Sequence, residues 1–125
     1  MNWGPPLWKE MHQYSFNYPV KPVTQDKLQA IQYYNSIVHR IPCMKCVRHY
    51  TMHLHDRPIE NAVENKDILV KWVIDLHNNV NIDTGKRVWS YDEVYRLYEP
   101  SYMMFYILMI IGFLLFSRRI FARKS

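Results

Sequence analysis

Residues 101–117 contain no charged side chain, and this run divides the chain into an apolar segment and a mixed head. As an α-helix the run would span about 25 Å, slightly less than a hydrocarbon core of about 30 Å. Tyr102 and Tyr106 would mark one membrane interface, and Arg118 and Arg119 the other. A buried core helix is the alternative, but a small head has little room to cover a helix that is apolar on every side. The run therefore predicts a single membrane-spanning helix.

The basic charge of the chain is concentrated at its C-terminal end. The chain has 16 Lys and Arg, 11 Asp and Glu, and a formal charge of +5. Four of these cations lie within residues 118–125, so the head has 12 basic and 11 acidic residues. A head so close to neutral does not support binding to nucleic acid. We divide the chain into a head over 1–99, an anchor over 100–117 and a basic tail over 118–125.

Two rules disagree about the side of the membrane on which the head lies. Met1 runs into Trp3-Gly4-Pro5-Pro6, so no apolar core of a signal peptide is expected. The positive-inside rule would keep the tail in the cytosol and send the head across the membrane. A C-terminal anchor without an upstream signal emerges last, which leaves the head in the cytosol. We favour this second arrangement, a single-pass membrane protein with a cytosolic head.

The head shows helical spacing, and its strand patterns are weak. Trp8, Met11 and His12 follow a Pro-Pro start at i, i+3 and i+4. Further helices are expected over residues 25–39 with Thr24 as cap, 43–55, 66–81, and after a cap at Ser90. Their apolar faces comprise Leu28, Ile31, Tyr34, Ile37 and Val38, then Ile68, Leu69, Trp72, Val73 and Leu76, then Val94 and Leu97. Five helices in so short a head predict a compact all-α bundle.

The chain has two cysteines, and with nearby histidines they spell C-x2-C-x2-H-x3-H-x-H. The residues of this pattern are Cys43, Cys46, His49, His53 and His55. Cysteines and histidines at this spacing are typical of zinc ligands. If the segment is one helix, Cys43 and His53 are separated by a rise of about 15 Å, too far to share one ion. Residues 44–53 contain no Gly or Pro that would break the helix. Zinc is therefore disfavoured, though still open.

The same geometry suits a redox pair. Pro42 fits the first turn of a helix, so Cys43 would lie at the terminus, where free N–H groups stabilise a thiolate. Lys45 and Arg48 add positive charge nearby. Cys46, one turn into the helix, would be more buried and would face the electron acceptor, while Cys43 exchanges with a substrate dithiol. A purely structural cross-link is the alternative, but so short a loop stabilises little.

The acceptor must lie within the helical head. There is no βαβ pattern and no G-x-G-x-x-G for a dinucleotide. His77, Asn78 and Asn81 share one helix face, and Asn is costly in mid-helix unless its side chain binds something. Each residue alone would suit solvated surface. Followed by Gly85 and Lys86, the group favours a ligand with amide, hydroxyl and phosphate groups.

Four motifs follow one another along the head. They are Trp8-x3-His12, Pro42-Cys43-x2-Cys46-x2-His49, Trp72-x4-His77-Asn78-x-Val80-Asn81 and Gly85-Lys86. In this order and at these separations they resemble the Erv/ALR-type FAD-linked sulfhydryl oxidases, over about residues 3–98. Each motif alone is weak, whereas four in order are specific. Trp3-Gly4-Pro5 and the small size are similar to the short members that large DNA viruses encode.

The resemblance implies a four-helix bundle with a fifth crossing helix, FAD among the helices, and a homodimer. It implies that Cys43 takes electrons from a dithiol protein and that Cys46 lies against the isoalloxazine. The residues it implies to bind FAD are Gly4, Trp8, His12, His49, Trp72, His77, Asn78, Val80, Asn81 and Lys86. Dioxygen would reoxidise the FAD to give hydrogen peroxide, and the substrate would gain a disulfide.

The chain also departs from the pattern of that family. Ile41 stands where many relatives have a tyrosine. A second disulfide that many relatives carry is missing, and an apolar contact between Ile74 and Tyr91 would replace it. No shuttle pair of cysteines is present, so Cys43 would meet its substrate directly. The expected substrate is a small dithiol protein that relays oxidation to viral proteins. A head without a structural disulfide suits a reducing compartment, on a host or virion membrane.

A thiol oxidase is the favoured function. One alternative is a non-enzymatic membrane adaptor that binds zinc through Cys43, Cys46 and nearby histidines. Another is a catalytically silent helical scaffold that keeps the fold alone.

Overall fold

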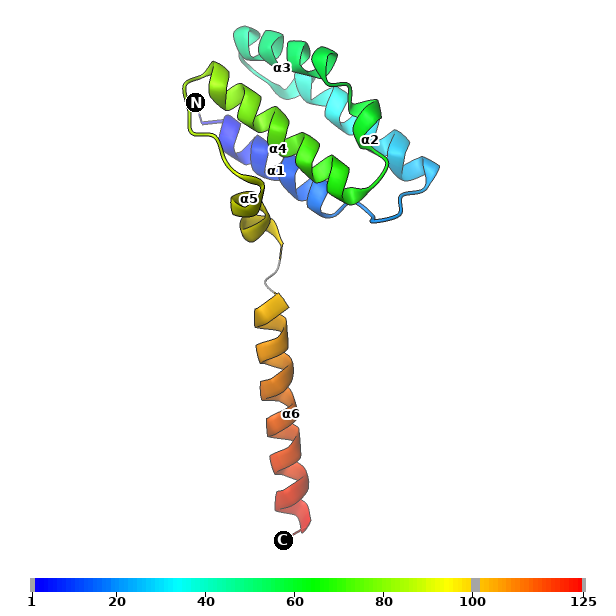
Figure 1. Ribbon diagram of the computed structural model, residues 1–125, viewed down its shortest axis with the longest axis vertical. Coiled ribbons are helices and arrows are strands. Elements are labelled where there is room, and N and C mark those ends of the chain that lie inside the picture. Colours follow the sequence, from blue (N-terminus) through cyan, green and yellow to red (C-terminus); the bar gives the residue numbers. More distant parts are fainter. Residues whose placement is uncertain (1, 100–101, 125) are drawn as a thin grey trace.

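The computed structural model describes residues 2–99 and 102–124, and within these residues every regular element is a helix. The elements are α1 (Gly4–Phe16), α2 (Thr24–Ser36), the 3-10 helix η1 (Ile37–Arg40), α3 (Met44–Asp56), the 3-10 helix η2 (Ile59–Ala62), α4 (Lys66–Asp83), α5 (Tyr91–Tyr98) and α6 (Tyr102–Lys124). Figure 1 shows α1 to α4 together in the head, α5 beside α1 and α4, and α6 extending away. The predicted four-helix bundle with a fifth helix is confirmed.

The start of α5 and the turn before it follow the predicted signals. The Ser90 hydroxyl accepts the N–H of Glu93 at 3.2 Å, and the Glu93 carboxylate accepts the N–H of Ser90 at 2.8 Å. This reciprocal capping box fixes the first turn of α5. Upstream, α4 continues past the predicted end at Asn81 to Asp83. Gly85 then adopts a φ of +68°, a left-handed backbone that glycine tolerates best.

The second helix differs from its prediction at both ends. Val23 is the N-cap in place of Thr24, and the Asp26 carboxylate accepts the N–H of Val23 at 2.8 Å. At the other end, α2 stops at Ser36 and the chain tightens into η1. The sequence predicted one helix as far as His39 because an i, i+3 pattern fits both kinds of helix over a single turn.

The main core contains buried tyrosines whose hydroxyls have partners. Tyr34 is fully buried, and its hydroxyl donates to the carbonyl of Met11 at 2.8 Å. The Tyr50 hydroxyl donates to the carbonyl of Tyr34 at 2.7 Å. These bonds connect α1, α2 and α3. They also give the buried hydroxyls of Tyr34 and Tyr50 the hydrogen-bond partners that buried polar groups need. Three predicted core positions are wrong, because Leu28, Ile68 and Leu97 are exposed.

A second apolar cluster joins α5 to the bundle. Its buried members are Phe16, Val70, Ile74 and Val94. Tyr91 lies at the start of α5, and its hydroxyl donates to the Asp75 carboxylate on α4 at 2.8 Å. The predicted apolar contact between Ile74 and Tyr91 stays a prediction, whereas this hydrogen bond is a polar link between the same two helices.

Helix α6 carries the predicted anchor. Its stretch Met104–Arg123 is long and apolar enough to cross a membrane, with a mean hydropathy of 1.8, and no part of that stretch is buried against the head. This exposure is unlike that of a core helix. The helix runs on to Lys124 and includes Arg118 and Arg119, and the division into an anchor and a basic tail stays a prediction. The proposed head–anchor boundary and the Tyr102 side chain lie outside the described residues.

Candidate functional site

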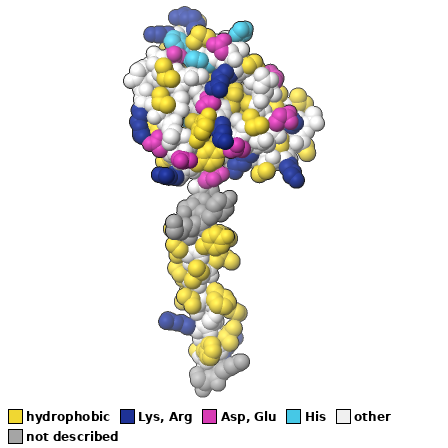
Figure 2. All heavy atoms as spheres, in the orientation of Figure 1, with side chains coloured by type: hydrophobic (Ala, Val, Ile, Leu, Met, Phe, Trp, Pro, Cys, Tyr) yellow, Lys and Arg dark blue, Asp and Glu magenta, His cyan; other side chains and the backbone are white. Residues whose placement is uncertain are grey.

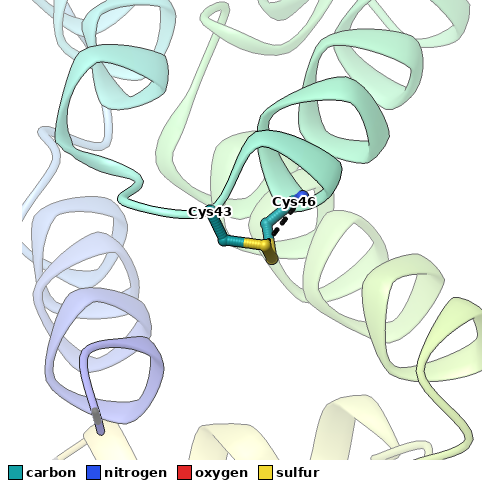
Figure 3. The surroundings of a disulfide bond; sticks show 2 residues. All are labelled: Cys43 and Cys46. Atoms are coloured by element: carbon teal, nitrogen blue, oxygen red, sulfur yellow. Dashed lines mark hydrogen bonds between the residues drawn. A yellow bond between two sulfur atoms is a disulfide. The ribbon is translucent and has the colours of Figure 1, made fainter.

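The two cysteines form a disulfide at the start of α3. Cys43 is the N-cap of the helix, in an extended conformation, and Cys46 lies in the first turn. Their Cα atoms are 5.1 Å apart, and the N–H of Cys46 donates to Sγ of Cys43 at 3.3 Å (Figure 3). Pro42 precedes the cap, so it lies before the first turn, whereas the sequence predicted it within that turn. Cys43 nevertheless lies at the helix terminus, as predicted.

The histidines of the zinc pattern have other partners. Helix α3 is continuous, and His49 Nδ1 and His53 Nε2 lie 3.0 and 2.6 Å from Oδ2 of Asp83. This shared carboxylate ties α3 to the end of α4, and the two hydrogen bonds hold the pKa of Asp83 below its ordinary value. His55 is exposed and pairs with Asp56. Among the described residues, no three His, Cys, Asp or Glu side chains gather in a way that could hold a metal ion.

A cavity of about 630 Å³ opens in the head between α1, α3, α4 and α5. It has a largely apolar and aromatic wall, and residues from four different helices meet there. The predicted site residues that line it are Gly4, Trp8, His12, Cys46, His77, Asn78, Val80, Asn81 and Lys86. One sulfur of the disulfide, that of Cys46, therefore belongs to the cavity wall. The sequence motifs thus converge on one place.

Three predicted site residues lie outside that wall. Cys43 does not line the cavity and reaches it only through its bond to Cys46. His49 instead contacts Asp83. Trp72 is buried in the core, where its Nε1–H donates to the carbonyl of Arg57 at 3.0 Å. The Trp72 and His49 positions therefore support the structure around the cavity, with no described contact to its interior.

The buried His12, the half-buried His77 and the Trp8 ring form one wall of the cavity. His12 Nε2 lies 2.9 Å from His77 Nδ1, and the Trp8 ring stacks on His77 at 4.1 Å between centroids. Burial lowers the pKa of His12 to about 4. Burial, with help from His12 and Lys86, lowers the pKa of His77 to about 3. Both rings are therefore neutral at pH 7. Among the described residues, Nδ1 of His12 is buried without a hydrogen-bond partner.

Two asparagines of α4 form hydrogen bonds to the backbone of the segment 87–89, which lines the cavity. The Asn78 amide donates to the Trp89 carbonyl at 2.8 Å, and its oxygen accepts the N–H of Trp89 at 2.9 Å. The Asn81 amide donates to the carbonyl of Arg87 at 3.0 Å. The sequence had suggested a ligand as the reason for asparagines in mid-helix. The structure shows that the backbone of the segment 87–89 uses this hydrogen-bonding capacity.

We expect Asn78→Ala to lower the free energy of unfolding by about 1–3 kcal/mol, because two hydrogen bonds worth about 0.5–1.5 kcal/mol each are lost. Asn79→Ala is the matched control, since no hydrogen bond of the Asn79 side chain occurs among the described residues. Urea unfolding measures both variants, and hydrogen exchange at the Trp89 N–H should accelerate only in Asn78→Ala. Equal losses in the two variants would contradict the role of Asn78.

Several cavity residues were missed by the sequence reasoning. Arg87 lies over the Trp89 ring at 4.0 Å and pairs with the Glu93 carboxylate. Ile41, singled out only as a departure, also lines the cavity. The adjacent cations at positions 86 and 87 were the one available signal for Arg87. Further apolar and aromatic residues in the wall are Leu7, Met11, Tyr50, Ile74, Trp89 and Tyr98, and their spacing could not be told from that of ordinary core positions.

Comparison with known proteins agrees with this arrangement. The chain is 37% identical over 100 residues to a "Probable FAD-linked sulfhydryl oxidase" of Acanthamoeba polyphaga mimivirus, covering 79% of this chain and 70% of the relative. It is 30% identical over 101 residues to the "FAD-linked sulfhydryl oxidase" of a warthog isolate of African swine fever virus, covering 81% and 83%. Its fold is similar to the crystal structure of the yeast Erv1 core, with a TM-score of 0.72 and 23% identity, over 79% of this chain and 82% of that one. A profile of the Erv1 / Alr family matches residues 5–99, and the chain therefore belongs to that family.

Proposed function

We propose that this protein is an FAD-linked sulfhydryl oxidase that forms disulfides in substrate dithiols. The observation that carries the proposal is the disulfide whose inner sulfur, that of Cys46, forms part of an aromatic cavity while Cys43 lies outside it. Such a pair can exchange with a substrate on one side and pass electrons to a cofactor on the other. Membership of the Erv1/Alr family and the names of the viral relatives support this function.

The cavity fits FAD in size and in chemistry. Its volume of about 630 Å³ lies within the range of about 300–1,000 Å³ that is usual for ligand and cofactor sites. Trp8 and His77 supply a flat wall for a ring system. The unpaired Nδ1 of His12 offers a hydrogen bond, and Lys9 and Lys86 offer positive charge for phosphates. When bound, FAD supplies an acceptor for two electrons, which dioxygen then removes to give hydrogen peroxide.

The thiol half of the reaction balances on the residues of this chain. A substrate thiolate attacks Sγ of Cys43, the bond between the cysteines breaks, and Cys46 leaves as a thiolate. The second substrate thiolate then attacks the substrate sulfur of the mixed disulfide and releases Cys43. The substrate has lost two electrons and its two thiol protons, and the cysteine pair has gained the electrons. Lys45 and Arg48 stabilise the thiolate of Cys43, since both lie within the first two turns of α3.

The flavin content of the full chain, purified in a non-ionic detergent, tests the proposal. We expect a yellow protein that releases about one FAD per chain on denaturation and takes up oxygen with dithiothreitol. Stoichiometric zinc without flavin would instead support the membrane adaptor. Flavin without any oxygen uptake would support the catalytically silent scaffold.

We further propose that α6 anchors the protein in a host or virion membrane with the head in the cytosol. The exposed apolar stretch Met104–Arg123 supports the anchor. Protease added to intact membranes should then digest the head, and protection of the head would contradict this orientation. A homodimer, the remaining expectation for the assembly, predicts a mass of two chains by light scattering after subtraction of the detergent.

The proposed substrate is a small dithiol protein that relays oxidation to viral proteins. The large DNA viruses among the relatives support this setting, and the position of the half-buried Cys43 outside the cavity supports a protein substrate. Cys46→Ser should hold the oxidised relay protein as a mixed disulfide on Cys43. Equal capture by Cys43→Ser would contradict the assignment of Cys43 as the exchanging thiol.

A further inference from the structure

We propose that the face of α3 around Cys43 selects dithiol segments whose cysteines are flanked by acidic side chains. The inference rests on the proposed function, and it names the class of substrate that the exchanging cysteine would accept. It is carried by the distribution of unpaired cations in the head, by the lack of nearby carboxylates, and by one exposed apolar side chain.

Two cations on this face of α3 lack a bond to any carboxylate that the structure describes. Six of the twelve cations in the described residues 2–99 bond to a carboxylate, namely Lys27, Arg40, Arg57, Lys66, Lys71 and Arg87. The cations of that range without such a bond are Lys9, Lys21, Lys45, Arg48, Lys86 and Arg96. Lys9 and Lys86 line the cavity, where a cofactor's phosphates would neutralise them. Lys45 and Arg48 are exposed beside the disulfide, and within the described residues neither bonds to a carboxylate.

No carboxylate of α3 lies near these two cations. Between Pro42 and His55 the sequence contains no Asp or Glu, and the first acid, Asp56, lies at the far end of the helix. The carboxylate that reaches α3 from α4, that of Asp83, is bound by His49 and His53. Figure 2 shows basic and histidine side chains, with acidic ones among them, at the end of the head where Figure 1 places α3. The field around Cys43 is therefore positive although the head as a whole is nearly neutral.

An apolar side chain lies at the centre of this positive face. Met44, between the two cysteines, is 74% exposed, and Pro42 beside it is exposed as well. A flexible thioether can pack against varied apolar groups. The complementary substrate segment therefore has an apolar residue close to its cysteines and carboxylates on either side. Because the contacts are exposed, their charge acts mainly on the rate of encounter and on its salt dependence.

Two short dithiol peptides test the selection, one with glutamates and one with lysines around the same C-x2-C core. For the full chain in non-ionic detergent at low salt, we expect a kcat/KM about tenfold higher for the acidic peptide, and a smaller difference at high salt. In Lys45→Glu/Arg48→Glu we expect the preference to vanish or reverse. The ratio between the peptides is the readout, because any effect of these cations on the Cys43 thiolate changes both rates alike.

The matched control is Lys21→Glu/Arg96→Glu. It changes the net charge by the same amount as Lys45→Glu/Arg48→Glu, but at unpaired cations away from the disulfide. It should keep the preference for the acidic peptide. Binding of serine-substituted peptides, measured by fluorescence anisotropy, tests docking without turnover. If the protein oxidises dithiothreitol but shows no preference between the peptides, in rate or in binding, the inference is overturned and the proposed oxidase function stands. If the protein does not oxidise dithiothreitol but still binds the acidic peptide in preference, the proposed oxidase function is overturned and the inference stands. A preference that survives in Lys45→Glu/Arg48→Glu would also overturn the inference.

Discussion

Replacing Cys46 by serine is expected to lower the turnover of a small dithiol by about a thousandfold or more, since the pair could no longer form or break its disulfide. The same loss is expected for Cys43→Ser. A thousandfold loss corresponds to about 4 kcal/mol of transition-state stabilisation. The disulfide closes so short a loop that its removal costs at most about 2 kcal/mol of stability. Lost activity in a protein that remains folded therefore reports on the redox role of the pair.

The two serine variants should differ in thiol reactivity. Cys43 does not line the cavity, so in Cys46→Ser its thiol should react quickly with an alkylating reagent. In Cys43→Ser the remaining thiol of Cys46 borders the cavity, and bound FAD should slow its alkylation. Oxygen uptake, circular dichroism and alkylation rates check these expectations together. Dithiol oxidation that persists in both variants would show that the pair is not the route of the electrons.

The order of helices could be predicted from the sequence because it depends on local signals, whereas the convergence of the motifs was implied by the family resemblance. Pro5 and Pro6 start α1, Ser90 caps α5, and Gly85 supplies the left-handed turn after α4. The four motifs also predicted membership of the Erv1/Alr family, which is confirmed. Such signals act within a few residues, so no knowledge of the tertiary packing was needed.

The parts that could not be predicted depend on contacts between distant segments. Asn78 lines the cavity, but its bonds to the backbone of Trp89 were not predicted, because the position of Trp89 follows from the packing of α5. The bond of His49 to Asp83, at the end of α4, was not predicted either, and the role of His49 in binding FAD stays a prediction. Leu28 fits an apolar stripe by its spacing, yet no helix covers it. A sequence pattern gives the face of a helix, whereas the neighbour that covers that face is set by the whole fold.

The stability of the flavin-free chain is expected to fall steeply as the pH drops from 7 to 5, because the buried His12 and the half-buried His77 are neutral rings in the folded chain. The pKa of His12 is about 4 and that of His77 about 3 in the folded chain, mainly through burial. In the unfolded chain both would return to about 6.5. Between these values the unfolded state binds more protons than the folded state, so stability is complete above pH 6.5 and decreases as the pH falls.

The size of this effect is large compared with the usual stability of a small domain. Each histidine that takes up a proton only on unfolding lowers the free energy of unfolding by about 1.4 kcal/mol per pH unit well below pH 6.5. For the two rings this amounts to roughly 3 kcal/mol between pH 6.5 and pH 5, against a total of about 5–15 kcal/mol. Because the pKa of Asp83 is lowered from a value near 4, that carboxyl group contributes only at more acidic pH.

Urea unfolding of the full chain, stripped of flavin in non-ionic detergent, measures this dependence at pH 7, 6 and 5 through tryptophan fluorescence. His77→Gln keeps a hydrogen-bonding side chain but removes one titrating group, so the slope of stability against pH should fall by about half. His39→Gln and His55→Gln replace exposed histidines and should leave the slope unchanged. An unchanged slope in His77→Gln would mean that His77 already carries its proton in the folded chain. The wall of the cavity would then be cationic, and the neutral stack of Trp8 on His77 would no longer describe the surface offered to the FAD ring.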